Sequence, residues 1–135
     1  MVQCITNPPT LRVANISSRT AHPTLCCSTQ TIFNITNSGT GPINISRFFA
    51  YWVKAPESQK LARLTLNGNT IWNPSDADSP TDIPMESNWV NGANLTIPND
   101  GTGQNLVILF QNTLQASGYE LHFVFDIGCQ VIATK

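Results

Sequence analysis

The sequence predicts an all-β protein built as an antiparallel two-sheet β-sandwich. Runs of about 5 to 10 apolar and β-branched residues recur between turn signals, and no segment keeps a helical period. The strongest run, 119–127, alternates as a strand with one buried and one solvated face does. Its predicted core side is Tyr119, Leu121, Phe123, Phe125 and Ile127, and its predicted solvent side is Glu120, His122, Val124 and Asp126.

The same pattern predicts the other strands in chain order. The expected strands are Thr10–Ile16, Thr31–Thr36, Ile43–Val53, Leu61–Leu66, Thr70–Trp72, Ala93–Ile97, Asn105–Gln111, Tyr119–Ile127 and Cys129–Ala133. Between them lie Asn37–Pro42, Asn67-Gly68, Asn99–Gly103 and Ser117-Gly118, which supply the positive φ angles or the fixed proline φ that reversals require. Asn67-Gly68 is the best hairpin turn, because apolar residues stand on both sides of it.

Two strands are apolar on both faces. Leu106–Phe110 has no polar side, and Phe48–Trp52 is nearly as apolar. A sandwich strand needs only one dry face, so either the irregular segment 73–91 or another protein molecule is expected to cover the second one. Segment 73–91 is rich in Pro, Asp and Ser, and we expect it to be a surface excursion.

Length and composition indicate one domain. The 135 residues show no shift in composition, so 1–135 is taken as a single β-sandwich domain in which residues 1–9, with Pro8 and Pro9, are an N-terminal arm. Charged residues make up 11% of the chain and the net charge is −1. Without a basic cluster, neither nucleic acid nor an anionic membrane is an expected partner. No run reaches the roughly 18 apolar residues that membrane insertion needs.

An Asn-, Thr- and Ser-rich, charge-poor composition suggests an extracellular or cell-surface location. The first residues, Met1-Val-Gln-Cys4, lack the regions of a signal peptide. An export signal or anchor is therefore expected upstream of this segment.

Four cysteines are expected to form two disulfides: Cys4, Cys26, Cys27 and Cys129. Cys26 and Cys27 are adjacent, and neighbouring residues of an extended chain point to opposite faces, so they should serve different partners. Cys27–Cys129 with Cys4–Cys26 is the favoured pairing, and the reverse stays open. Zinc is not expected, because two adjacent cysteines lack the spacing of a zinc site.

No catalytic constellation stands out, so no enzyme and no cofactor are expected. His122 lies on the polar side of its strand beside Glu120 and Asp126. A hydrolase could use such a group, but the chain has no Gly-x-Ser-x-Gly elbow. The pattern is typical of a surface histidine.

Two weaker ligand sites are considered. Asp76, Asp78 and Asp82 place three carboxylates within seven residues, which is chemistry that calcium prefers, but the segment 76–82 lacks the glycine and distal Glu of an EF-hand and contains Pro80. A solvated loop is the favoured interpretation. Trp89 is the tryptophan expected to be exposed, where it could stack on a sugar.

The order of these segments resembles a known kind of module. Asn34–Ser46, Trp52, Leu64–Gly68, Trp72, Trp89, Leu106–Phe110 and Gly118–Val131 look like an Ig-like β-sandwich module of exported bacterial surface and pilus-associated proteins. The resemblance implies an Ig-like or jelly-roll-type sandwich and carries no catalytic residues. The Cys4 arm has no counterpart in it.

These observations lead to one functional expectation. The chain is expected to be a non-enzymatic extracellular structural or adhesive module, such as a subunit of a surface filament or pilus-like assembly. Copies of itself or other surface-protein subunits would be its partners, through edge pairing or strand donation. The alternative is a carbohydrate-binding module that holds a glycan with Trp89 and the loop 73–91.

Overall fold

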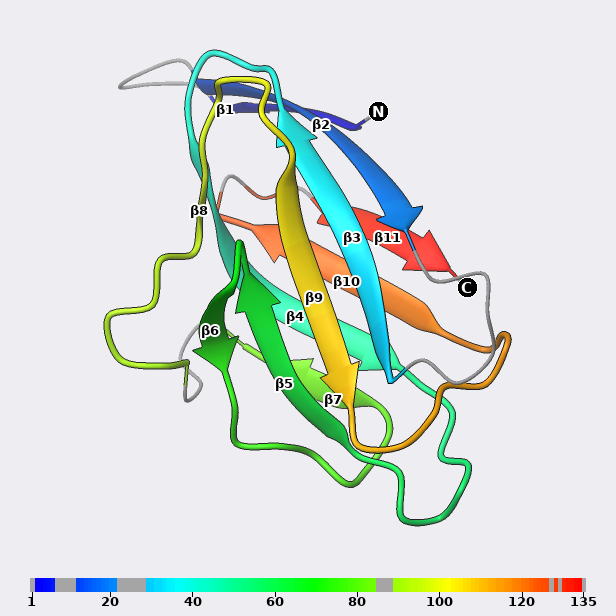
Figure 1. Cartoon of the computed structure of the whole chain (residues 1–135). Helices are drawn as coiled ribbons and strands as arrows, with labels where there is room; N and C mark the ends of the chain where they lie inside the picture. Colours follow the sequence, from blue (N-terminus) through cyan, green and yellow to red (C-terminus); the bar gives the residue numbers. More distant parts are fainter. Residues whose placement is uncertain are drawn as a thin grey trace.

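The computed structural model describes residues 2–6, 12–21, 29–84, 89–126, 128 and 130–134. These residues form strands in two antiparallel sheets and contain no helix, which confirms the predicted all-β sandwich (Figure 1). The described residues accordingly offer no helix with the length and apolar character that crossing a bilayer would take.

The first sheet has six strands in the order β1-β2-β3-β9-β5-β6. Their bounds are Val2–Thr6 for β1, Arg12–Ala21 for β2, Gln30–Asn37 for β3, Gln104–Phe110 for β9, Leu61–Leu66 for β5 and Asn69–Trp72 for β6. Every neighbouring pair is antiparallel. The first strand of the chain is therefore an edge strand.

The second sheet has five strands in the order β11-β10-β4-β7, with β8 paired to the far end of β4. Their bounds are Gln130–Thr134 for β11, Glu120–Phe125 for β10, Ile43–Tyr51 for β4, Thr81–Ile83 for β7 and Thr96–Ile97 for β8. The last strand of the chain thus lies at the edge of this sheet, close to β2 of the first sheet (Figure 1).

The core lies between the two sheets and follows the predicted alternation. In β10, Leu121, Phe123 and Phe125 are buried, while the residues between them are only partly buried. The Phe123 ring lies 5.4 Å from that of Phe33 and 5.3 Å from that of Phe48, between ring centroids, so aromatic contacts join the two sheets. Trp52 and Trp72 are buried, as expected for strand tryptophans.

The hairpin between β5 and β6 confirms the turn prediction. Asn67 has φ 50° and Gly68 has φ 81°, and two consecutive positive φ angles are typical of the tight turn that matches strand twist. The Asn67 side chain reinforces the turn, because its Oδ1 accepts from the backbone N of Asn105 at 3.0 Å.

Several element bounds differ from the prediction. Residues 2–6 pair with β2 along their whole length, where an arm was expected. The strand expected at 10–16 is observed as Arg12–Ala21, and the one expected at 93–97 shrinks to Thr96–Ile97. The excursion 73–91 contains β7, because Thr81 and Ile83 are buried and pair with Ala50 and Phe48.

Among the described residues, no segment of 73–91 covers the outer side of the doubly apolar strands. β7 extends the second sheet beside β4, so it does not lie over the outer face of that sheet. No described segment of 73–91 crosses in front of β9 and β3 (Figure 1). The described parts of this loop, 73–84 and 89–91, therefore do not cover the two strands, and residues 85–88 lie outside the described part of the chain.

Candidate functional site: the outer face of the five-stranded sheet

A row of side chains crosses the outer face of the second sheet. Strand register places Asp82 opposite Phe49, Phe49 opposite His122, and His122 opposite Ile132. The alternation of β4 and β10 turns these side chains away from the core, because Phe48 and Phe123 beside them are buried. Four strands thus contribute to one continuous surface.

The centre of this surface is apolar and exposed to solvent. Tyr51 and Ile132 are 48% and 50% exposed and are the two exposed large hydrophobic residues among those whose side chains are described. The Phe49 ring contacts Tyr51 edge-on at 5.0 Å and His122 edge-on at 5.7 Å, between ring centroids. We call the surface formed by Phe49, Tyr51, His122 and Ile132 the aromatic face.

Two ion pairs flank the aromatic face. Arg47 Nε and Nη2 donate to the two carboxylate oxygens of Asp82 at 2.8 and 2.6 Å, and the guanidinium lies 5.9 Å from the Phe49 ring centroid. Hydrogen bonding to Asp82 and its negative charge raise the pKa of Arg47. On the other side, His122 Nε2 lies 2.7 Å from Glu120 Oε1. Both pairs are partly exposed, so they fix side-chain positions more than they add stability.

The two edges of this sheet differ. β7 is three residues long and is bounded by Pro80 and Pro84, which have no N–H for pairing with a further strand. β11 carries no proline and ends the strand order on the opposite side. Ile132, on β11, therefore joins the aromatic face to a sheet edge at which another strand could pair.

The side chains of this surface are of the kind that pack against another surface. Covering aromatic and aliphatic side chains that are partly exposed to solvent lowers the free energy, so it stabilises a contact with another surface. The flanking charges are held in fixed positions and can orient such a surface. Among the residues that the structure describes, no group of three or more His, Cys, Asp or Glu side chains is placed to hold a metal ion.

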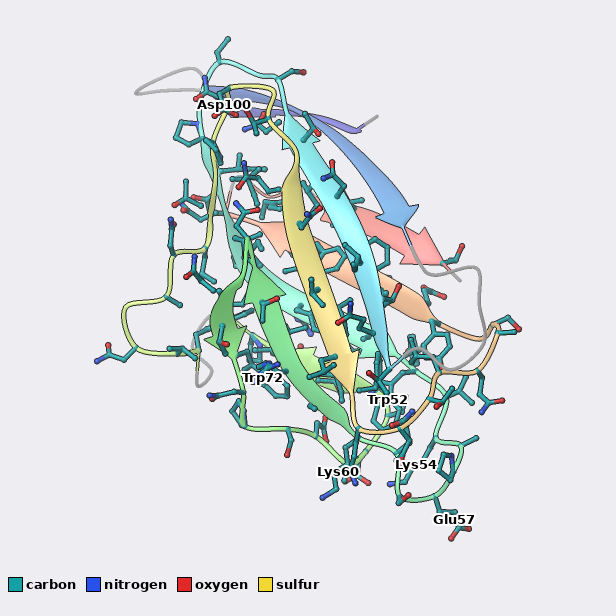
Figure 2. All side chains as sticks on the ribbon, in the orientation of Figure 1. Trp52, Lys54, Glu57, Lys60, Trp72 and Asp100 are labelled. Carbon is teal, nitrogen blue, oxygen red and sulfur yellow. The ribbon has the colours of Figure 1, made fainter. Side chains whose placement is uncertain are left out.

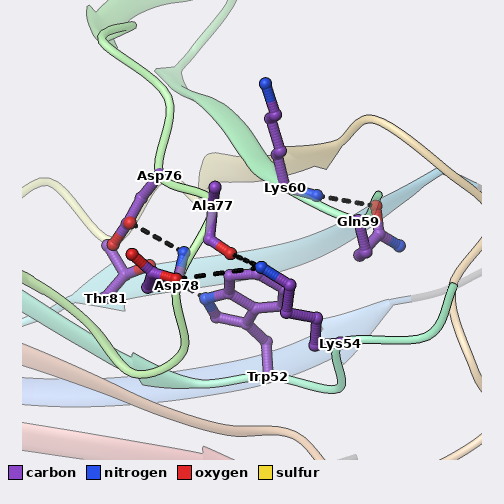
Figure 3. A network of polar contacts seen from close by, with 8 residues as sticks. All are labelled: Trp52, Lys54, Gln59, Lys60, Asp76, Ala77, Asp78 and Thr81. Carbon is purple, nitrogen blue, oxygen red and sulfur yellow. Dashed lines mark hydrogen bonds and ion pairs between the residues drawn. The ribbon is translucent and has the colours of Figure 1, made fainter. Parts of the chain in front are cut away.

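The three carboxylates considered for calcium are not brought together. Asp76 Oδ1 accepts from the backbone N of Asp78 at 3.0 Å, and Asp76 also pairs with Leu61 through its backbone. Asp78 lies 3.8 Å from Lys54 Nζ, which also donates to the carbonyl of Ala77 (Figure 3). Asp82 faces Arg47 on the aromatic face. Each carboxylate thus has a separate partner.

Trp89 packs partly against the core. Its Nε1 donates to the carbonyl of Pro84 at 3.1 Å, and the backbone N of the following Val90 donates to the carbonyl of Ile71 at 2.8 Å. These contacts hold Trp89 beside β6, with its side chain partly buried. Glycan binding by Trp89 stays a prediction without a supporting contact.

The cysteine predictions lie outside the described part of the chain. Cys26, Cys27 and Cys129 are not among the described residues. For Cys4 the structure gives the backbone, which pairs with Ala14 in the β1–β2 ladder. The two disulfides therefore stay predictions.

Sequence reasoning pointed to three of the four residues of the aromatic face: Phe49, Tyr51 and His122. The run 48–52 signalled a second apolar side on β4, and the alternation of 119–127 placed His122 and Glu120 on the solvent side. The contribution of Ile132 and the Arg47–Asp82 pair had no local signal, because they depend on which strands are neighbours.

Comparison of the whole chain with protein-family models, with curated proteins and with solved structures found no match.

Proposed function

We propose that this protein is a non-enzymatic structural or adhesive module of an extracellular surface, and that it works as a subunit which contacts neighbouring protein molecules. The observation that carries the proposal is the aromatic face, in which Tyr51 and Ile132 are about half exposed on a regular sheet surface. Large apolar side chains that gather on an open face are typical of protein contact sites.

The edges of the sandwich support the same function. β1 ends the first sheet and β11 ends the second, and neither strand contains a proline or a charged residue. Natural proteins commonly protect sheet edges with charges or prolines, as Pro80, Asp82 and Pro84 do here at β7. The unprotected edges are therefore suited to pairing with a strand of a neighbouring subunit.

Light scattering over a range of protein concentrations, with negative-stain microscopy, tests the proposal. We expect the average mass to rise with concentration and elongated particles to form. The double variant Tyr51→Ser/Ile132→Ser should weaken self-association at least tenfold, because it removes the apolar centre of the contact.

Glu57→Ser/Lys60→Ser is the matched control. Both residues are exposed at the loop end of the sandwich, away from the strand faces (Figure 2), and the double change leaves the net charge as it is. It should self-associate like the unchanged protein. A mass that stays monomeric at every concentration for the unchanged protein would contradict the proposal.

A further inference from the structure

Charged residues are divided unequally between the two sheets. The six strands of the first sheet contain Arg12, Arg19 and Arg63 and no Asp, Glu or Lys. The five strands of the second sheet contain Arg47 against Asp82 and Glu120, with His122 as the titratable neighbour. Of the three arginines, Arg63 is the one whose side chain is described, so with His122 neutral the described charges amount to +1 on the first sheet and −1 on the second.

The charged residues whose side chains are described lie outside the core. Arg63 is exposed, and Arg47, Asp82 and Glu120 have side chains that are 42 to 48% exposed. The buried polar residues among those with described side chains are neutral ones. The charges described on the outer faces are therefore Arg63 on the first sheet and Arg47, Asp82 and Glu120 on the second, and these two faces point in opposite directions.

The outer face of the first sheet has an apolar centre of its own. Ile32 stands opposite Val107 in the β3–β9 ladder, and Leu109 follows on β9 with Arg63 opposite it on β5. The three aliphatic side chains are partly buried by their neighbours and Arg63 is exposed beside them. We call this surface, formed by Ile32, Val107, Leu109 and Arg63, the aliphatic face.

We propose that the aromatic face of one copy docks on the aliphatic face of a second copy. The inference rests on the proposed function and names the partner surface of that contact. Each face offers an apolar centre, and the carboxylate of Glu120 would meet the guanidinium of Arg63 across the interface. Opposite charges at matched positions favour this pairing over others.

The charge distribution disfavours the two symmetric alternatives. Two aromatic faces would place the −1 surfaces against each other, and two aliphatic faces would place one Arg63 against another. Like charges across an interface cost free energy and exclude wrong partners. Pairing of unlike faces brings Arg63 against a surface whose described charges sum to −1.

The geometry of the sandwich then determines the form of the assembly. The two faces lie on opposite sides of one molecule, so a copy that docks on one face leaves the other face free for the next copy (Figure 1). Such a head-to-tail contact does not close on two copies and propagates as a filament. If two copies used the same face for their contact, association would stop at a dimer.

Mixing of two face variants tests this arrangement by sedimentation velocity. Tyr51→Ser/Ile132→Ser damages the aromatic face, and Arg63→Glu damages the aliphatic face. Each variant alone should stay monomeric, since every contact needs both faces. An equimolar mixture should form dimers and nothing larger, because one intact aromatic face and one intact aliphatic face are available per pair of copies.

A charge exchange gives a second test within one chain. Glu120→Arg and Arg63→Glu should each weaken self-association at least tenfold, and the chain with both changes should recover most of it. Lys60→Glu is the matched control for Arg63→Glu, because it makes the same charge change at an exposed residue outside the strands. It should leave self-association within twofold of the unchanged protein.

The outcomes separate the two proposals. If Arg63→Glu assembles like the unchanged protein while the aromatic-face variant does not, the contact does not use the aliphatic face, so the inference is wrong and the proposed function stands. The inference is also wrong if Glu120→Arg and Arg63→Glu each weaken self-association but the chain with both changes does not recover it. If the unchanged protein never associates, both proposals are wrong.

Discussion

The hydroxyl groups of two buried threonines, Thr31 and Thr81, should contribute differently to stability. Thr81 Oγ1 accepts from Trp52 Nε1 at 2.9 Å, and both residues are buried. Thr31 is equally buried, but its Oγ1 has no hydrogen-bond partner among the described residues. A buried polar group stabilises a fold only when it is paired, so the two hydroxyls should have opposite effects on stability.

Replacement of each threonine by valine, which has nearly the same shape, tests this difference. Thr81→Val should lower the free energy of unfolding by about 1–3 kcal/mol, because it leaves the Trp52 N–H buried without an acceptor. Thr31→Val should be neutral or stabilising, because it removes an unpaired group. Urea unfolding measures both, and equal losses from the two variants would contradict the argument.

Tyr119 gives the fold a dependence on alkaline pH. The residue is 3% exposed, and its burial raises the pKa of the phenol, although the hydrogen bond from the backbone N of Gln115 to its oxygen acts in the opposite direction. Below a pH of about 10 the phenol is protonated in both states. Above it the unfolded chain loses the proton first, so stability falls as pH rises toward the folded pKa.

Tyr119→Phe should therefore reduce the loss of melting temperature between pH 9 and pH 11. The variant starts from a slightly lower stability at neutral pH, because the N–H of Gln115 loses its acceptor. Tyr51→Phe, at an exposed site on the aromatic face, should keep the alkaline loss because Tyr119 is still present. An unchanged pH profile in Tyr119→Phe would contradict the assignment.

At the scale of elements, the β5–β6 hairpin shows how local chemistry fixes a register. Asn67 and Gly68 supply two positive φ angles, and Leu66 and Asn69 face each other directly across the turn. That register turns Leu64 and Leu66 into the core. A slip by one residue would move these side chains to solvent, so the turn and the core select the same pairing.

Gly68→Ala should destabilise the protein by about 1–2 kcal/mol through its backbone conformation. A methyl group at this position would meet nothing within 4 Å, so the cost comes from the φ angle of 81° and not from a clash. Asn69→Ala, the exposed next residue, is the control and should change stability by less than about 0.5 kcal/mol. Chemical denaturation distinguishes the two.

Edge strands show the opposite case, in which the element depends on its neighbours. β7 is only three residues long, and it exists because Thr81 and Ile83 fill the core beside β4. Its flanking prolines and Asp82 make it a closed edge, whereas β1 and β11 are open. Under the proposed function, β1 and β11 are edges at which a strand of a neighbouring copy could pair, and β6, which also lacks proline and charge, is a further edge of the first sheet.

At the scale of the whole molecule, the sandwich presents two outer faces of unlike chemistry. One is aliphatic and carries arginine, and the other is aromatic and carries carboxylates. Charged residues make up only 11% of the chain, and four of them, Arg47, Arg63, Asp82 and Glu120, lie on these two faces beside the apolar centres. Under the proposed function, this combination favours contact between subunits.

The predicted disulfides would fasten both chain ends to the entrance of β3. A peptide map under non-reducing conditions should find Cys26 and Cys27 in separate bridges, one with Cys4 and one with Cys129. Reduction should then lower the free energy of unfolding by about 2–4 kcal/mol for each bridge. A Cys26–Cys27 link, or four free thiols, would contradict the prediction.

Much of the fold follows from local pattern. The period of two in 119–127, the turn at Asn67-Gly68 and the apolar runs were enough to predict the core strands and the burial of Trp52 and Trp72. β1 and β7 escaped prediction because short edge strands need few apolar residues. Their pairing comes from the strand beside them, which no local window contains.

Sequence alone determined that the chain folds as a β-sandwich, because alternation and turn chemistry act between residues that are close along the chain. Only the tertiary structure decided that Phe49, His122 and Ile132 form one row, that Asp82 pairs with Arg47, and that Arg63 lies on the outer face of the other sheet. These features depend on strand order, and strand order is set by packing between segments that are far apart in the sequence.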